Sequence, residues 1–494
     1  MDRDRGPRPS VPLAARTLAE LDPRVTVPTY DRTSLGRGIV HIGVGGFHRA
    51  HQAAYLDDLC QNGLTDWSIT GAGVLPGDAA MADALQQQDN LYTLITRDRE
   101  STDPRVIGSI VDYVLATPAI TPLIDVLADP STRIVSLTIT EGGYPVDDTT
   151  GQFLTSPEGD LPPAFEAIVR ALQRRRDEGL GGFSVVSCDN IMHNGATARA
   201  ATLGVAATVE PGLEEWIGRN VSFPNTMVDR ITPATTAADR DLLVDRYGLV
   251  DRWPVVAEPF TQWVIEDSFL EGRPPWEDAG ALFTTDVEPY ETLKLRLLNG
   301  GHSCLAYLAA LAGHVHVHEV MADRPFVDLL RCFLEDEASP ALPSSPPGIN
   351  VARYRIQLAE RFANPAVSDQ VVRLCQDGTS KLPKFLIPTI ETQLKMGGQV
   401  KMAALALAGW CQYLLGKDDT GRDLEIARDP NLRLVTELAE ASTTDPRAFL
   451  RFTGVFSMTL ANDAVFAPAF AAALASLREV GVHSTLDRWL RGDA

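Results

Sequence analysis

The segment Lys294-Leu-Arg-Leu-Leu-Asn299-Gly-Gly-His302 combines an amine, an amide and an imidazole within an apolar run. In an α-helix, Lys294 and His302 would be separated by about 12 Å of rise and about 80° of rotation. Lys294, Asn299 and His302 would therefore share one broad side of the helix. Burial among leucines disfavours a charged lysine, and a neutral lysine can serve as a general base. Spacing alone favours a structural alternative, in which a lysine starts the helix, Asn-Gly-Gly breaks it and the histidine is simply hydrogen-bonded.

A glycine-rich turn near the N-terminus could hold a dinucleotide. Residues 38–44 predict a short buried strand, and residues 49–60 have the 3.6-residue period of a helix. Between them lie Gly43, Gly45 and Gly46, where the missing Cβ atoms would let a pyrophosphate approach the backbone N–H groups. His48 replaces the third glycine of the dinucleotide-binding pattern, so a plain strand-to-helix turn is an equal alternative.

Two further loops follow expected strands. The strand predicted at 67–74 lacks the usual ribose-binding acid at its end, and the first acid after it is Asp78. An acid there would bond a ribose 2′-hydroxyl and repel a 2′-phosphate, which favours NAD over NADP. The turn at 138–144, with Thr140 and Glu141, follows another strand end, where open α/β sheets place ligands.

Strand and helix signals alternate through the first part of the chain, which predicts an α/β, doubly wound Rossmann-type sheet. From Pro289 onward, Ala- and Leu-rich amphipathic runs predict a mostly α-helical domain. We therefore expect a polar lead-in at 1–36, a dinucleotide-binding domain at 37–286 and a helical substrate and catalytic domain at 287–494. The expected elements are strands at 91–96, 106–110, 133–139, 183–190, 220–233 and 255–258, and helices at 122–128, 164–175 and 194–207.

The composition limits the classes of partner. A net charge of −21 over 494 residues argues against a nucleic-acid partner, and the 45% apolar content is that of a globular protein. Six cysteines without a Cys-x-x-Cys pair indicate free thiols in a reducing compartment. The sequence has no 18-residue apolar run and no signal-peptide core near its start. We expect a cytoplasmic, monomeric protein that acts on a small molecule and has no membrane partner.

Two other sequence patterns, one typical of a metal site and one of another dehydrogenase family, do not fit their surroundings in the chain. His314, His316 and His318 would share one face of a strand and could bind a metal, but the helical context would distribute them around an axis. We therefore expect no metal. Tyr290 and Lys294 match the Tyr-x-x-x-Lys of short-chain dehydrogenases, but that family's glycine pattern is missing. The cysteine spacing does not support a zinc alcohol dehydrogenase either.

Five motifs in a fixed order resemble the mannitol dehydrogenase family, the polyol-specific long-chain dehydrogenases. The resemblance runs from about Gly36 to the C-terminus and implies hydride exchange between a polyol and NAD without a metal. Within the family, the motif pattern is most similar to that of the members that interconvert mannitol and fructose. It also implies an active site in the cleft between the two domains. The motifs are GVGGFHRAH at 43–51, TITEGGY at 138–144, CDNIMHNG at 188–195, MVDRITP at 227–233 and Lys-x4-Asn-x-x-His at 294–302.

The resemblance also implies catalytic roles. Lys294 would be the general base, and Asn190 and Asn299 would hold the developing alkoxide with neutral amide donors. His302 would bond the reacting oxygen. Glu291, one turn before Lys294, would pass the proton to water, although a nearby carboxylate opposes the lowered lysine pKa that a base requires.

Substrate choice is open within the family. Asp229, Arg373 and Lys381 would line the polyol pocket, but both cations could equally pair with a uronate. Siblings act on fructuronate, tagaturonate, arabinitol or sorbitol. A cofactor-binding regulator without turnover is the alternative of another class, and the full Lys-Asn-Asn-His set argues against it. The expected cofactor contacts are Ile42, Gly43, Val44, Gly45, Gly46, Phe47, His48, Arg49, Asp78, Thr140 and Glu141.

Overall fold

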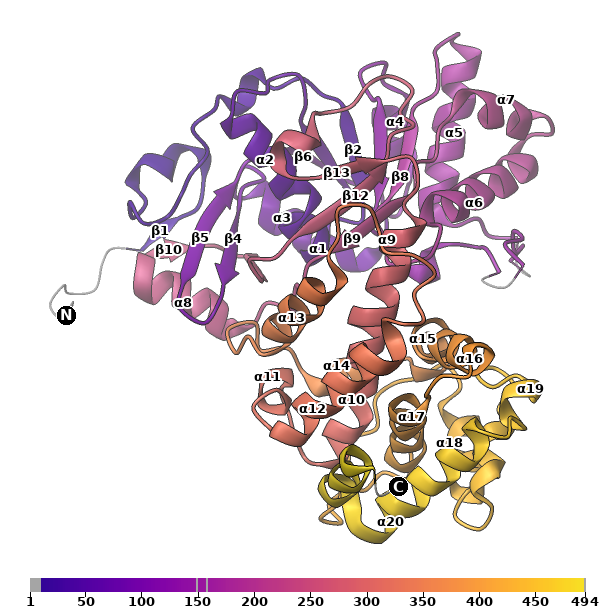
Figure 1. The fold of residues 1–494 in the computed structure, drawn as a ribbon. Coiled ribbons are helices and arrows are strands. Elements are labelled where there is room, and N and C mark those ends of the chain that lie inside the picture. The colour runs from indigo at the N-terminus through magenta and orange to yellow at the C-terminus, as the bar shows by residue number, and fades with distance from the viewer. Residues whose placement is uncertain (1–9, 148–149, 157–158, 493–494) are drawn as a thin grey trace, which may run out of the picture. The chain divides into compact units, whose positions relative to one another are not determined.

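The computed structural model describes residues 10–147, 150–156 and 159–492, and the chain divides into two compact units (Figure 1). The first unit is Met1–Glu288 and the second is Pro289–Ala494. Each unit has hydrophobic cores of its own.

A five-stranded parallel sheet is the centre of the first unit. Its strands are β2 Ile39–Ile42, β3 Ile69–Gly73, β6 Ile110–Leu115, β7 Ile134–Leu137 and β8 Ser184–Ser187. Their order is β6-β3-β2-β7-β8, and each neighbouring pair is parallel. All residues of β2, β3, β7 and β8 are buried, which explains the near-continuous apolar runs that predicted them.

Helices cover both faces of this sheet, because successive strand residues point to opposite sides. Ile39 belongs to a core that includes residues of α2, whereas Val40 belongs to one that includes α4, α5 and α6. The predicted doubly wound α/β fold is thereby confirmed. The helices of this unit are α1 Gly46–Ala50, α2 Gln52–Gln61, α3 Ala79–Gln86, α4 Thr121–Ala128, α5 Pro163–Asp177, α6 Asn194–Val209, α7 Leu213–Asn220 and α8 Ala237–Tyr247.

Three smaller sheets complete the first unit. Their strand orders are β11-β4-β5, β13-β12-β9 and β1-β10. The bounds are β1 Val11–Pro12, β4 Tyr92–Arg97, β5 Thr102–Ile107, β9 Thr226–Asp229, β10 Leu249–Val250, β11 Val255–Ala257, β12 Gln262–Glu266 and β13 Leu282–Thr284.

Three predicted elements differ from the structure. The single helix expected at 49–60 is interrupted at His51, whose φ of −125° and ψ of −93° separate α1 from α2. The strand expected at 106–110 is the end of β5 and the start of β6. The long strand-like stretch at 220–233 contracts to the four residues of β9.

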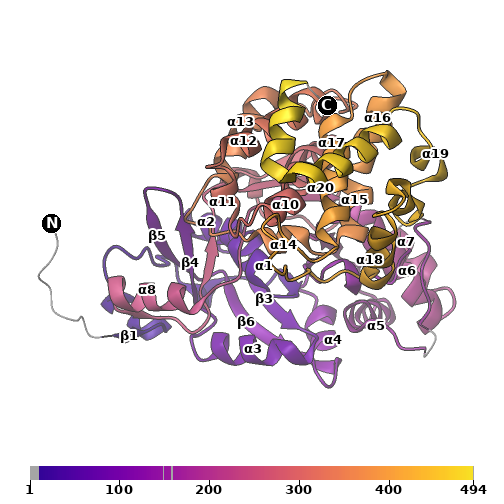
Figure 2. The same ribbon diagram turned by 90° about the horizontal axis from the view of Figure 1, so that it is seen from below.

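The second unit is helical, as predicted. The helix α17 lies at its centre, because residues 402–411 are all buried there, and it packs against α10 and α20 (Figure 2). Across the described parts of both units, no helix has the length and apolarity that a membrane crossing needs. The helices are α9 Glu288–Leu293, α10 Gly300–Leu311, α11 Val317–Val320, α12 Arg324–Cys332, α13 Val351–Phe362, α14 Val371–Cys375, α15 Gly378–Phe385, α16 Ile387–Met396, α17 Lys401–Tyr413, α18 Leu432–Ala441, α19 Met458–Ala461 and α20 Phe466–Arg491.

The segment between α9 and α10 is not an α-helix. Residues Lys294–Asn299 form a π-helix, in which the N–H of Gly300 reaches back to the carbonyl of Leu295. A second π-helical segment spans Phe333–Ala338. The α-helical rotation predicted between Lys294 and His302 is therefore wrong, although the helical path is continuous through the two glycines. Such wide turns are rare and occur frequently at functional sites.

Candidate active site

The glycine turn of the first unit follows β2, between the ends of β3 and β7. Gly43 has a φ of +94°, and a Cβ there would lie 2.3 Å from the carbonyl oxygen of Thr138. Only glycine fits this position without a backbone shift. At Gly45 the nearest atom to an added Cβ is 3.8 Å away, and at Gly46 it is 3.7 Å away. Glycine at these two positions is not needed for packing, so the open backbone suits a ligand that must approach closely, such as a pyrophosphate.

A buried histidine of β2, His41, is hydrogen-bonded to the residues that hold this turn. His41 Nδ1 lies 2.8 Å from Ser136 Oγ, and His41 Nε2 lies 2.9 Å from Thr138 Oγ1. Thr138 Oγ1 donates its proton to the carbonyl of Gly43 over 2.7 Å. Complete burial lowers the pKa of His41 to about 3, so the ring is neutral. We infer that Nε2 carries the proton and donates it to Thr138, which fixes the carbonyl of Gly43.

The side chains of several expected cofactor residues point into the protein. His48 is fully buried and stacks on His41 at 3.4 Å between ring centroids. Arg49 donates to the carbonyl of Trp253, and Ile42 and Val44 lie in the cores. Any contact of these four residues with a cofactor would therefore use the backbone. Phe47 is half-buried and stacks on His51.

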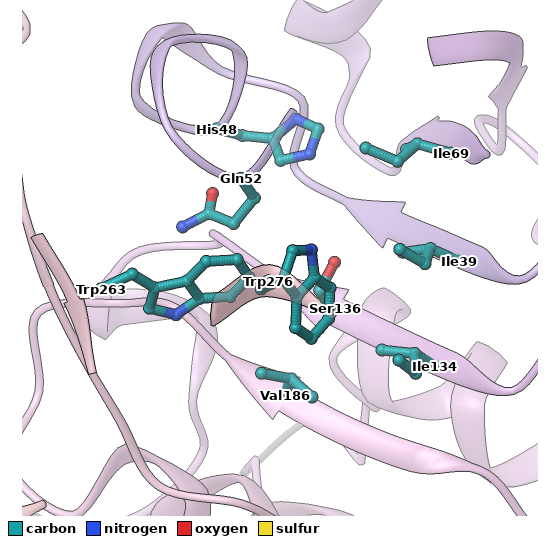
Figure 3. A pocket seen from close by; sticks show the side chains of 9 residues that line it. All are labelled: Ile39, His48, Gln52, Ile69, Ile134, Ser136, Val186, Trp263 and Trp276. Atoms are coloured by element: carbon teal, nitrogen blue, oxygen red, sulfur yellow. The ribbon is translucent and has the colours of Figure 1, made fainter. Parts of the chain in front are cut away.

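The buried ring of His48 lines an interior cavity (Figure 3). Five polar atoms of the side chains around it have no hydrogen-bond partner among the described residues: Nδ1 and Nε2 of His48, Oε1 of Gln52, and Nε1 of Trp263 and Trp276. The cavity has room for about one water molecule. A polar site of this size satisfies the conditions for a bound water.

Asp78 lies at the end of β3, as an acid that reads a ribose would. A Cβ added to Gly73, the last residue of β3, would lie 2.5 Å from the Cβ of Asp78. Asp78 Oδ2 accepts the N–H of Leu75 over 2.9 Å. The loop 74–78 thus turns back and brings the carboxylate to the strand end, beside the glycine turn of the neighbouring strand.

The turn after β7 is strained. Thr140 has a φ of 63° and a ψ of 166°, a combination that is almost restricted to glycine. Asp189 holds it there, because its carboxylate accepts the N–H groups of Ile139 and Thr140 and the hydroxyl of Tyr144 at 2.7–3.0 Å. Burial raises the pKa of Asp189, which these hydrogen bonds oppose. Asp189 was not predicted from the sequence as a residue that positions this turn. Its place beside Asn190 at the end of a predicted strand could have indicated that role.

The segment 188–195 also connects two of the predicted site residues. Asn190 is exposed in the bend after β8, and Asp229 is buried at the end of β9. Asn194 links these regions, since its amide donates to the carbonyl oxygens of Asp189 at 3.1 Å and of Thr226 at 2.8 Å. Asn194 was not predicted.

In the second unit, Lys294 is buried and stands on the first position of the π-helix, while His302 belongs to α10. Asn299 Oδ1 is buried and has no hydrogen-bond partner within the part of the chain that the structure describes. Glu291, expected to relay the proton, is buried in α9. One helical run therefore carries all four residues.

A carboxylate that was not predicted pairs with one of the expected substrate residues, Arg373. Asp369 accepts Arg373 Nε over 2.6 Å and a second bond from its Nη2. Burial raises the pKa of Asp369, but Arg373 and the nearby His302 together bring it below its usual value. The ring of His302 stacks on Phe362 at 4.0 Å between centroids. Lys381 donates to the carbonyl of Arg373 over 3.4 Å.

The chain thus combines a dinucleotide-binding unit of the Rossmann class with a helical unit that carries a Lys-Asn-His set. Residues 37–278 match the mannitol dehydrogenase Rossmann domain, and residues 286–478 match the mannitol dehydrogenase C-terminal domain. The chain belongs to the mannitol dehydrogenase family. The predicted family, fold class and enzyme class, an oxidoreductase with a nicotinamide cofactor, are confirmed.

Individual relatives agree with this assignment. The mannitol 2-dehydrogenase of Neosartorya fischeri is 42% identical over 482 residues, which cover 94% of this chain and 96% of the relative. The structure of Pseudomonas fluorescens mannitol 2-dehydrogenase with NAD and D-mannitol is 44% identical with a TM-score of 0.89, covering 97% of this chain and all of the other. A D-sorbitol dehydrogenase structure is 35% identical with a TM-score of 0.86, covering 96% of this chain and all of the other.

Proposed function

We propose that this chain is an NAD-dependent, metal-independent polyol dehydrogenase that interconverts D-mannitol and D-fructose. The observation that carries the proposal is the helical run of Lys294, Asn299 and His302, next to Arg373 and Lys381 in one unit. One relative of known structure that is similar over nearly the whole chain is a complex with NAD and D-mannitol.

Lys294 is the general base of this reaction. In the oxidation direction its neutral amine takes the proton of the substrate hydroxyl, and Glu291 relays that proton to water. Bound NAD supplies the hydride acceptor. Burial supports this role, because a lysine removed from water is easier to keep neutral.

The remaining site residues hold the reacting oxygen and the polyol. The amides of Asn190 and Asn299 stabilise the negative charge that develops on the oxygen, and neutral fixed donors cost no reorganisation there. The ring of His302 stacks on Phe362 and lies near the carboxylate of Asp369, and it bonds the same oxygen.

NAD binds at the glycine turn of the first unit. Gly45 and Gly46 leave the backbone open, Asp78 bonds the ribose 2′-hydroxyl, and Thr140 and Glu141 contribute from the end of β7. The strain at Thr140 supports a role for this turn, since such backbone outliers cluster at ligand sites.

A neutral polyol fits the charge of the site better than a uronate. The guanidinium of Arg373 is already paired with Asp369 through two hydrogen bonds, so a uronate carboxylate would compete with a neighbouring carboxylate for it. The six free cysteines support a cytoplasmic location, and the net charge of −21 argues against a nucleic-acid partner.

The test is a panel of mannitol, sorbitol, arabinitol, fructose, fructuronate and tagaturonate, with NAD(H) or NADP(H), followed by the absorbance of the reduced cofactor. We expect the highest kcat/KM for mannitol and fructose, and unchanged rates after treatment with a strong chelator. A preference for a uronate or for sorbitol would refute the substrate, and loss of activity on chelation would refute metal independence. Tight NADH binding without turnover on any compound would identify a regulator instead.

A further inference from the structure

Three side chains of the helical unit that take no part in the proposed reaction converge on one point. His314 Nε2 lies 3.1 Å and His483 Nε2 lies 2.8 Å from the same carboxylate oxygen, Oδ2 of Asp323. Among the described residues, this is the one group of three or more possible metal ligands whose atoms all lie within 4.8 Å of one another. We propose that His314, Asp323 and His483 form a zinc-binding site.

The ligand set favours a transition-metal ion over a hard cation. Two imidazoles and one carboxylate suit Zn²⁺, whereas Mg²⁺ and Ca²⁺ prefer oxygen ligands alone. Ligand atoms at 2.0–2.2 Å from a tetrahedral zinc lie about 3.4 Å apart, so Nε2 of His314 would move away from Asp323 by about 0.3 Å and Nε2 of His483 by about 0.6 Å. The side chain of His483 is 53% exposed and those of the other two are 20% exposed, which leaves a fourth position open to water.

The proton balance of such a site is simple. In the two hydrogen bonds to Asp323 we take Nε2 of each imidazole as the donor and the carboxylate oxygen as the acceptor. On zinc binding, each Nε2 exchanges its proton for the metal, and each ring becomes the tautomer protonated at Nδ1. Two Zn–N bonds and one Zn–O bond replace two hydrogen bonds, and the proton that leaves each Nε2 is balanced by the one gained at Nδ1.

The surrounding structure holds these three ligands in place from separate segments. Asp323 is the residue before the first turn of α12, and His314 follows α10 through the turn at Gly313, which has a φ of +86°. Phe326 is fully buried and meets both rings edge-on, His314 at 5.3 Å and His483 at 5.9 Å between centroids.

A kink in α20 brings His483 to the cluster. Gly481 has a φ of 75° and a ψ of 179°, which no helical residue adopts, and the helix restarts at Val482. Asp419 Oδ2 accepts the N–H of Val482 over 2.6 Å and would lie 2.9 Å from a Cβ at Gly481. The bend is therefore fixed by named contacts, and a metal there would join α20 to α12 and to the end of α10.

The proposed site is separate from the catalytic residues of the same unit. His302 stands near the start of α10 and His314 lies beyond its end, and nine residues of helix between positions 302 and 311 span about 14 Å. Zinc here should therefore affect stability and leave turnover unchanged.

The experiment is a titration of the chelator-treated full chain with ZnCl₂ by calorimetry, with thermal unfolding of the same samples. We expect one zinc per chain and a rise in Tm of about 1–3 °C at free zinc ten times the Kd. MgCl₂ should give neither effect. His483→Ala, a change at a half-exposed residue, should abolish the zinc-dependent rise and leave the zinc-free Tm and the turnover unchanged.

His316→Ala is the matched control, because His316 lies in the same segment but pairs with Glu319 instead of Asp323. It should bind zinc as the unmodified chain does. Asp323→Asn keeps a hydrogen-bond acceptor while removing the charge, and should weaken zinc binding at least tenfold. The proposal is overturned if zinc neither binds nor raises Tm, or if the zinc effect persists in His483→Ala, or if it is lost in His316→Ala.

Discussion

Replacing Gly45 by alanine would separate what the glycine turn needs for folding from what it needs for a ligand. Gly45 has a φ of −97° and a ψ of −170°, which alanine adopts without strain. An added Cβ would have the carbonyl oxygen of Gly43 as its nearest neighbour, at 3.8 Å. Stability should rise by about 0.4–1 kcal/mol, because the unfolded chain loses conformational freedom.

The same methyl group would stand where a pyrophosphate must approach the backbone. Losing one hydrogen bond to a charged phosphate costs about 1.5–3 kcal/mol, which corresponds to a roughly 10- to 150-fold higher Kd. We expect NADH affinity to fall by this factor in Gly45→Ala. The assay is a fluorescence titration with NADH, with thermal unfolding measured on the same preparation.

Two comparison variants make the result decisive. Gly218→Ala in α7, where the nearest atom to an added Cβ is 3.7 Å away, is the same change far along the chain and should leave NADH binding unchanged. Gly43→Ala should lower Tm, because it combines a φ of +94° with a 2.3 Å contact to Thr138. The reasoning is refuted if Gly45→Ala binds NADH within twofold of the unmodified chain, or if it destabilises the protein as Gly43→Ala does.

Three further predictions concern single side chains. Lys294→Ala should lower the polyol oxidation rate by about 10² to 10⁴ and remove its rise with pH, with NADH affinity kept and part of the rate restored by a small amine; near-full turnover would contradict the base role. Asp78→Ala should reduce the preference for NAD over NADP by about ten- to a hundredfold in kcat/KM, and an unchanged ratio would mean that the ribose is read elsewhere. Glu337 is buried under the N-terminus of α17, and burial raises its pKa from 4.5 to about 7. The folded chain holds this proton up to a higher pH than the unfolded chain does. The free energy of unfolding should therefore fall by up to about 3 kcal/mol as the pH rises from 4.5 to 7. Glu337→Gln should flatten this pH dependence, measured by urea denaturation, and a dependence that persists in the variant would show that another group causes it.

The parallel sheet was predictable because its strands are buried on both faces. A strand such as Ile39–Ile42 must then be apolar at every position, and that run is visible in the sequence. The helix α8 was missed because its sequence is rich in charged residues. Thr236 and Asp239 form a capping box at its start, a local signal that would have revealed it.

Parts of the site depend on contacts that no sequence pattern encodes. A π-helix and an α-helix accept the same residues, and packing of the surrounding helices decides between them. In the sequence, nothing distinguishes the positioning carboxylates Asp189 and Asp369 from the other acidic residues. The inward direction of the His48 side chain follows from its stack on His41, a contact made in three dimensions.

The π-helix has a consequence for changes in chain length. Its wide turn holds one more residue than the regular helix on either side of it would need. Deleting one residue between Leu295 and Leu298 should let the backbone close into an uninterrupted α-helix from α9 to α10, which has better hydrogen bonds. The same deletion would turn Lys294 by about 100° relative to Asn299 and His302. Variants shortened by one residue here should therefore be well folded and bind NADH, and the proposed base role of Lys294 predicts that they fail to turn over.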